Sequence, residues 1–278
     1  MQVFFLSQDD KAHVPLGITA PNKQVPILIH AEYRVYLPDH DWVITERHKL
    51  IPSVYTGIVI APKIPGQSKA VGYSGPTFVV IRSGKHSSST ANTHVQDFET
   101  LLTLKLFEQL VKTEEGLIKP VIIITVDGSP VENPRYQKVI SFVINHFKRH
   151  DLDAIFIACN IPGRSAYNRV ERRMAPLSRE LSGLILSYDH YGSYLDENGR
   201  TIDEDMEKNN FAYAGKTLSE IWISISMDSY PVAATYVDSG KSNFLDMDWY
   251  SKYVQESQYL IQIVKCEEKK CCSPARSG

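Results

Sequence analysis

Two short apolar segments constrain the fold of this chain more than any other feature of its sequence. Residues 121–126 read VIIITV and residues 154–158 read AIFIA, so neither alternates between apolar and polar side chains. Such runs are typical of strands that are buried on both faces of a sheet. The segment between them opens with Asn133 and Pro134 and carries apolar residues at helical spacing. The sequence therefore predicts parallel β–α units.

The segments around this unit complete an α/β pattern. They are predicted strands at residues 3–8, 27–37, 54–60 and 77–82, and predicted helices at residues 92–112 and from Glu171 onward. An antiparallel meander followed by alternating strands and helices is the element order of the ribonuclease H-like fold. We therefore expect a mixed sheet with helices on both faces.

The 278 residues are enough for one large domain or two small ones. We expect a ribonuclease H-like core at residues 1–186, with an insert around residues 38–92. A mostly helical extension is expected at residues 187–264, with helices within residues 206–227 and 249–264. A cysteine-containing tail follows at residues 265–278.

Charge and hydropathy exclude several classes of protein. The net charge is −2, so any binding of nucleic acid must come from a local basic patch. No apolar run approaches the roughly 20 residues needed to span a bilayer, and the start MQVFFLSQDDK lacks the features of a signal peptide. We expect an intracellular protein without a membrane partner, located in the nucleus if its source is eukaryotic.

Acidic residues fall at the ends of the predicted elements. Asp9 and Asp10 close the first strand, Asp127 ends the strand at residues 121–126, and Glu171 opens the last helix. Ligands gather outside the carboxyl ends of parallel strands, so three of these acids can meet there. Taken singly, each has an ordinary explanation as a solvated strand end, a turn residue or a first-turn glutamate.

A cluster of three carboxylates suits a hard divalent cation. Mg²⁺ takes oxygen ligands, and a pair of such ions can activate water or a 3′-hydroxyl and stabilise the leaving oxygen of a phosphodiester. Without metal the carboxylates repel one another and the pKa of at least one of them rises. The sequence therefore predicts a Mg²⁺ or Mn²⁺ site.

Three segments carry a resemblance to a known family. PGRSAYNRVERR resembles the Pro-x-Ser-x-x-Asn-x-hydrophobic-Glu signature of DDE-type transposases and integrases, and FLSQDDK and DGSPVENPR resemble the segments of their first and second aspartates. Residues 1–185 are most similar to the catalytic cores of ISAzo13-like and IS630/Tc1-like transposases. The whole chain also resembles transposon-derived proteins of invertebrate genomes.

The resemblance implies a role for each matching residue. It implies that Asp9, Asp127 and Glu171 are catalytic metal ligands, with Asp10 as the alternative first ligand. Asn168 matches the family's asparagine, which orders the site or contacts DNA. A basic patch beside the acids is expected to bind DNA phosphates or, alternatively, to be a solvated helix face; its members are Arg164, Arg169, Arg172 and Arg173.

The expected function is that of a transposase-derived polynucleotidyl transferase that cleaves and joins DNA strands, working as a homodimer or higher oligomer on DNA. Two alternatives stay open. One is a non-catalytic DNA-binding or scaffold protein that has kept the fold, and the other is a nuclease of related fold.

The four cysteines do not form a disulfide framework. Cys159 lies in an apolar segment and is expected to be a buried thiol. Cys266, Cys271 and Cys272 cluster in VKCEEKKCCSP, which predicts either part of a Zn²⁺ site or a frayed tail.

Overall fold

The computed structural model of the protein describes residues 2–18, 48–61, 67, 70–87, 89–128, 136–161, 167–238, 254–257 and 259–277. The predicted strand at residues 27–37 lies outside them. The longer strands are β1 Val3–Asp10, β3 Lys49–Gly57, β4 Thr77–Ser83, β5 Val121–Val126, β6 Ala154–Cys159, β8 Tyr230–Tyr236 and β10 Leu260–Val264. The short strands are β2 Val14–Pro15, β7 Ser226–Met227 and β9 Gln255–Ser257. The α-helices are α1 Ala91–Thr103, α2 Glu108–Val111, α3 Gln137–Arg149, α4 Glu171–Arg179 and α5 Glu204–Ile223.

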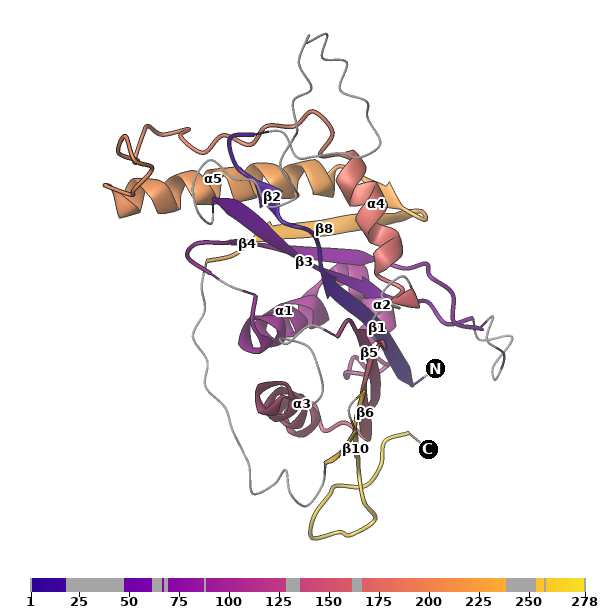
Figure 1. The fold of residues 1–278 in the computed structure, drawn as a ribbon. Coiled ribbons are helices and arrows are strands. Elements are labelled where there is room, and N and C mark those ends of the chain that lie inside the picture. Colours follow the sequence, from indigo (N-terminus) through magenta and orange to yellow (C-terminus); the bar gives the residue numbers. More distant parts are fainter. Residues whose placement is uncertain are drawn as a thin grey trace.

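The strands form one mixed sheet with the order β7-β8-β4-β3-β1-β5-β6-β10-β9 (Figure 1). β3 is antiparallel to both β1 and β4, whereas β1, β5 and β6 run parallel to one another. β8 then joins β4 in parallel, and β10 joins β6 antiparallel. The expected α/β class with a mixed sheet is therefore confirmed.

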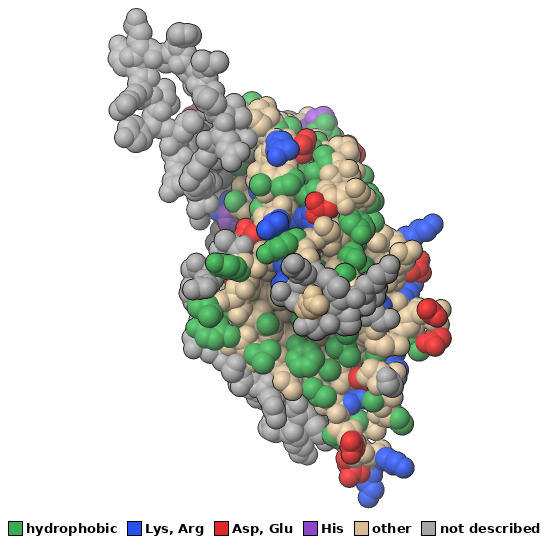
Figure 2. All heavy atoms as spheres, turned by 90° about the vertical axis from the view of Figure 1, so that its right-hand side faces the viewer, with side chains coloured by type: hydrophobic (Ala, Val, Ile, Leu, Met, Phe, Trp, Pro, Cys, Tyr) green, Lys and Arg blue, Asp and Glu red, His purple; other side chains and the backbone are tan. Residues whose placement is uncertain are grey.

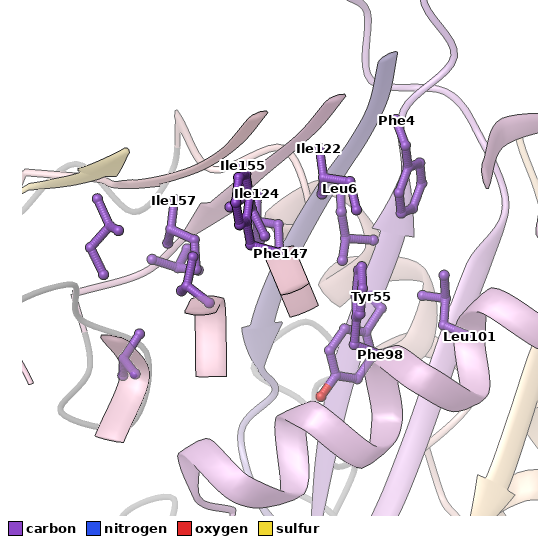
Figure 3. Close-up of a cluster of buried hydrophobic side chains, with 14 of the residues drawn as sticks. Phe4, Leu6, Tyr55, Phe98, Leu101, Ile122, Ile124, Phe147, Ile155 and Ile157 are labelled. Atoms are coloured by element: carbon purple, nitrogen blue, oxygen red, sulfur yellow. The ribbon is translucent and has the colours of Figure 1, made fainter. Parts of the chain in front are cut away.

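Side chains of the sheet contribute to two hydrophobic layers, one on each face. On one face, Leu6, Ile122 and Ile155 pack with apolar residues of α1 and α3, such as Phe98 and Phe147 (Figure 3). The alternate residues of β5, which point to the other face, are only half-buried, so the expected burial of this strand on both faces is not borne out.

The second layer lies under α4 and α5. Val54 and Val79 from the sheet belong to this layer, together with Leu177 of α4 and Phe211 and Trp222 of α5. The indole N–H of Trp222 donates to the backbone oxygen of Leu177, which joins the two helices. The sheet thus carries helices on both faces, as predicted.

The structure corrects two predicted helices. The helix expected at residues 92–112 ends at Thr103, because Leu104 adopts an extended conformation before a short 3-10 turn at Lys105–Phe107. Residues 255–264 were predicted to be helical but form β9 and β10. In β10 the side chains of Ile261 and Ile263 are buried, so the pattern has the period of a strand.

The extension at residues 187–264 is therefore not mostly helical where the structure describes it. Its helix α5 begins two residues before the segment at 206–227 for which a helix was expected, and its strands β8 and β10 pair with β4 and β6. The boundary at residue 186 stays a prediction. None of the helices that the structure describes is long and apolar enough to cross a membrane.

Candidate active site

The strand register brings two of the predicted acids to neighbouring strand ends. In the parallel pair of β1 and β5, Val3 lies opposite Val121 and Ser7 opposite Thr125. Continuing this register by two residues places Asp9 opposite Asp127. Both positions share the face of Ser7 and Thr125, because strand residues two apart point to the same side. Asp9 and Asp127 therefore lie at the carboxyl end of the parallel strands and on the α4 face.

Glu171 is held at this edge by a buried hydrogen-bond network. The hydroxyl of Ser7 donates to Asn168 Oδ1 at 2.6 Å and accepts from the backbone N–H of Val170 at 3.0 Å. Asn168 Nδ2 donates to the backbone oxygen of Gln8 at 3.0 Å. These bonds fix the start of α4 against β1, and Glu171 is the first residue of that helix.

The electrostatics of Asp9 show that the charges of Asp127 and Glu171 act on it. Asp9 is only 9% exposed, and burial raises its pKa from the ordinary 3.8 to about 8, with further contributions from the negative charges of Asp127, Glu171 and Asp10. An accepted hydrogen bond from the backbone N–H of Asp10 opposes the shift. A buried carboxyl among carboxylates keeps its proton until a cation compensates the charge.

Asp10 faces the other side of the sheet. Its Oδ1 accepts from the hydroxyl of Ser53 at 2.6 Å, and Ser53 in turn accepts from Arg82. The guanidinium of Arg82 forms a buried ion pair with Asp97. Asp9 is therefore better placed than Asp10 to share a ligand with Asp127, although Asp10 still contributes to the field at Asp9.

Asn168 is a positioning residue in this structure. Its side chain is 1% exposed, and its amide oxygen also accepts from Thr125 at 3.3 Å. A buried amide with these partners cannot reach a DNA phosphate. Of the two roles that the resemblance implied, ordering the site is the one that its contacts support.

The predicted basic patch divides into surface and interior residues. The exposed guanidinium of Arg172 stacks on the ring of Tyr73 at 3.6 Å, and half-buried Arg169 lies 5.7 Å from the same ring. Arg169 also donates to the backbone oxygen of Gly72 at 3.0 Å. These two cations form a surface next to the start of α4. Arg164 lies outside the described residues.

Arg173 corrects the expectation of a DNA contact. It is 2% exposed, and its guanidinium donates to the backbone oxygen of Tyr73 at 2.6 Å and to Asp228 at 2.7 Å. The residue shares the buried side of α4 with Leu177, one helical turn away. Its charge therefore holds the loop at residues 73–75 and is not presented to a phosphate.

Lys11 is a site residue that the sequence prediction missed. Its side chain is 6% exposed and its ammonium donates to Ser178 of α4. Burial lowers its pKa to about 8, and the negative charge of Glu171 opposes this shift. The lysine directly after the two aspartates in FLSQDDK was the available signal. Lys11 supplies positive charge beside Glu171.

Among the described residues, two groups of side chains have ligand atoms that all lie within 4.8 Å of one another, and the three predicted acids do not form such a group. In the first, Glu99 Oε1 lies 2.9 Å from His146 Nδ1 and 2.9 Å from His150 Nε2. Burial alone would raise the pKa of Glu99, but hydrogen bonds from both histidines lower it below its ordinary value. Contacts of Glu99 with the two histidines join α1 to α3 and account for this arrangement without a metal.

The second group consists of the three C-terminal cysteines. The sulfur of Cys272 lies 3.6 Å from Cys266 Sγ and 3.6 Å from Cys271 Sγ. The expected cluster could therefore hold a metal ion. Cys159 is a buried free thiol at the end of β6, as expected.

Comparison with known proteins does not assign this arrangement to a family. No model of a protein family matches the chain, and neither the curated proteins nor the solved structures contain a match to it. The functional interpretation therefore rests on the geometry and chemistry of the residues described above.

Proposed function

We propose that the protein is a Mg²⁺- or Mn²⁺-dependent polynucleotidyl transferase derived from a transposase, which cleaves DNA and joins DNA strands. One observation carries the proposal: burial, together with the negative charges of Asp127 and Glu171, raises the pKa of Asp9 to about 8 at the carboxyl edge of the sheet. A folded chain keeps such a destabilising cluster where a ligand compensates it.

The arrangement of strands supports a ribonuclease H-like core. β4, β3 and β1 form an antiparallel meander, and β5 and β6 continue the sheet in parallel beside β1. This is the order that the proposal requires, since it places the end of the first strand beside the end of β5. The start of α4 is bonded to the same two strands through Asn168.

The donor set fits a hard divalent cation. Asp9, Asp127 and Glu171 would hold it, because Mg²⁺ and Mn²⁺ prefer carboxylate oxygens. When bound, the ion supplies a lowered pKa for an attacking water or 3′-hydroxyl and charge stabilisation for the leaving oxygen.

The chain's own residues position the acids and the substrate. Ser7 and Asn168 fix the start of α4, where Glu171 is the first residue of the helix. The guanidinium of Arg172, stacked on Tyr73, is exposed and suits a DNA phosphate. Lys11, whose buried ammonium donates to Ser178 of α4, places a positive charge near Glu171.

The test is metal-dependent nicking of supercoiled DNA by the full chain. Asp127→Asn removes a charge but little volume, so the folded protein should lose roughly a thousandfold or more in rate. Glu114→Gln, at an exposed site in the turn before β5, is the matched control and should keep full activity. If neither protein nicks DNA with Mg²⁺ or Mn²⁺ while both bind it, the non-catalytic scaffold replaces this proposal.

A second assay separates the transferase from a nuclease of related fold. A labelled DNA strand with a free 3′-hydroxyl is incubated with the protein and an unlabelled plasmid. Transfer of the label to the plasmid supports strand joining. Nicking without any transfer would leave only the nuclease.

A further inference from the structure

The C-terminal loop, residues 265–277, is bonded at both of its ends to the residues just before β6. At its start, the backbone N–H of Lys265 donates to the backbone oxygen of Asp153 at 2.8 Å, and Lys265 Nζ pairs with Asp151 and Asp153 at 2.9 and 3.0 Å. At its end, the backbone N–H groups of Arg276 and Ser277 donate to Asp153 Oδ2 at 2.7 and 2.5 Å. The loop at residues 265–277 is thus anchored, and the alternative of a frayed tail does not describe it.

The three thiols of this loop converge. The backbone N–H groups of Cys271 and Cys272 both donate to the backbone oxygen of Glu268, at 2.9 and 3.0 Å, which forms a tight turn. This turn brings Cys272 Sγ to 3.6 Å from the sulfurs of both Cys266 and Cys271. Zinc–sulfur bonds of about 2.3 Å in a tetrahedron set sulfur–sulfur separations of about 3.8 Å. The observed spacing is close to this value.

The surroundings favour a bound ion over a packed apolar cluster. Cys266 is exposed and the other two sulfurs are half-buried, so burial of apolar surface does not hold them together. The loop between them carries charges of both signs, Glu267, Glu268, Lys269 and Lys270, all exposed. Figure 2 shows charged side chains of both signs at the lower end of the molecule, where Figure 1 places the C-terminal loop.

We propose that Cys266, Cys271 and Cys272 bind one zinc ion as three thiolates, with a water molecule in the fourth position. Each thiol releases its proton to solvent on binding, and the three sulfurs replace three waters of the ion. Among the described residues, no fourth histidine, cysteine or acid completes the group. The open position distinguishes this site from a closed four-ligand one.

The proposed ion has a local structural consequence. The loop follows β10, which pairs with β6. Its anchor, Asp153, directly precedes β6, whereas Asp127 follows the parallel strand β5. The zinc site therefore lies at the opposite end of the parallel strands from the acids, and it stabilises the fold of the loop without taking part in DNA cleavage.

The experiment is a zinc titration of the reduced full chain in excess Mg²⁺, which keeps the acids occupied. A chromophoric chelator measures zinc affinity, and Cd²⁺ added alone reports thiolate ligation by its sulfur-to-metal charge-transfer absorbance. Cys266→Ser tests one ligand, and Cys159→Ser removes the buried thiol as a matched control. Glu99→Gln removes the other group with metal-ligand spacing.

Wild type, Cys159→Ser and Glu99→Gln should each bind one zinc tightly and show the Cd²⁺ absorbance. Cys266→Ser should lose at least about a hundredfold in zinc affinity and most of the absorbance. Trypsin gives a second readout, since zinc should protect Lys269 and Lys270 from cleavage in wild type and both controls but not in Cys266→Ser. Unchanged zinc affinity in Cys266→Ser, or loss of the site in Glu99→Gln instead, would overturn the proposal.

Discussion

The two ends of the parallel strands each carry a group of aspartates, and the chain treats them in opposite ways. Before β6, Asp151 and Asp153 are paired with Lys265, and Arg276 lies beside them. Burial would raise the pKa of Asp153, but hydrogen bonds from Ser277, Lys265 and Arg276 lower it below its ordinary value.

At the carboxyl end, burial and neighbouring negative charges together raise the pKa of Asp9 to about 8. Within the described part of the chain, Asp9 forms no ion pair. Asp9 and Asp153 are both buried aspartates, so burial does not explain the difference between them. What differs is that Asp153 is paired directly with Lys265, whereas no described cation pairs with Asp9. Acids that the chain neutralises are structural, and acids that it crowds together are candidates for binding an external cation.

The largest expected effect is at the structural end. Asp153→Ala should lower the free energy of unfolding by about 3–5 kcal/mol, because it leaves the buried ammonium of Lys265 without its closest buried acid and frees the last residues of the chain. Urea denaturation measures this change. Glu267→Gln, in the exposed part of the same loop, is the control and should leave the midpoint unchanged. Equal midpoints for Asp153→Ala and wild type would remove the contrast between the two ends.

Removing an acid at the carboxyl end of the strands should instead raise the free energy of unfolding. Without metal at pH 8, Asp9→Asn should raise the free energy of unfolding by on the order of 2–4 kcal/mol, because it removes a charge that the folded state disfavours. Since the folded pKa of about 8 lies above the ordinary 3.8, the contribution of Asp9 to stability is fully present below about pH 4 and is lost as the pH rises to 8.

The gap between Asp9→Asn and wild type should therefore close on acidification. Melting curves at pH 5 and pH 8 in a chelating buffer test this. Asp10→Asn serves as the control, because Asp10 accepts from Ser53 on the other face and contributes less than Asp127 or Glu171 to the field at Asp9, so its loss should bring a smaller gain. If the difference in stability between Asp9→Asn and wild type instead grew toward pH 5, it would not come from the charge of Asp9.

Bound metal should stabilise wild type but not a variant that lacks one of the acids. Mg²⁺ that binds only the folded acids adds about 2.7 kcal/mol at a concentration 100 times its dissociation constant, which is a melting shift of several degrees for a chain of this size. Asp127→Asn should be nearly indifferent to Mg²⁺. Differential scanning fluorimetry gives both values, and equal shifts in the two proteins would mean that the acids do not form one site.

The smallest expected effect concerns the arginines of α4, of which Arg172 is exposed and Arg173 is buried. Arg172→Ala should weaken DNA binding by about 0.5–1 kcal/mol and reduce the slope of log K against log salt concentration by about one, because the proposal has the exposed guanidinium contact a phosphate. Fluorescence anisotropy at several salt concentrations measures both. Arg173→Ala should instead lower stability, since its buried bonds to Asp228 and Tyr73 are lost. A loss of DNA affinity without a loss of stability in Arg173→Ala would contradict this division.

The strands with strong local patterns could be predicted from the sequence. β5 was predicted with its observed bounds, and β6 extends one residue beyond its prediction, because their apolar runs leave few alternatives. The placement of Asp127 and Glu171 at element ends followed directly. The prediction failed at β10, where Ile261 and Ile263 acquire their role only through pairing with β6, more than a hundred residues earlier.

Side-chain roles were harder to predict, because they depend on distant partners. Nothing near Asp153 in the sequence indicates that Lys265 and Arg276 will neutralise it. Arg173 is different, since its spacing from Leu177 along α4 already indicated a buried position. A helical-wheel argument would have separated it from exposed Arg172, whereas sequence motifs alone treat the two arginines alike.

The edges of the sheet have a consequence for how the chain is made. β4 and β6 are covered by β8 and β10, so each waits for residues that leave the ribosome much later. Until residues 230–264 emerge, the nascent sheet presents two uncovered edges lined by apolar strands, and such edges pair readily with other chains. Synthesis that stops before residue 230 therefore yields a product prone to aggregation. Folding inside the cell depends on keeping both edges away from other chains until β8 and β10 have been synthesised.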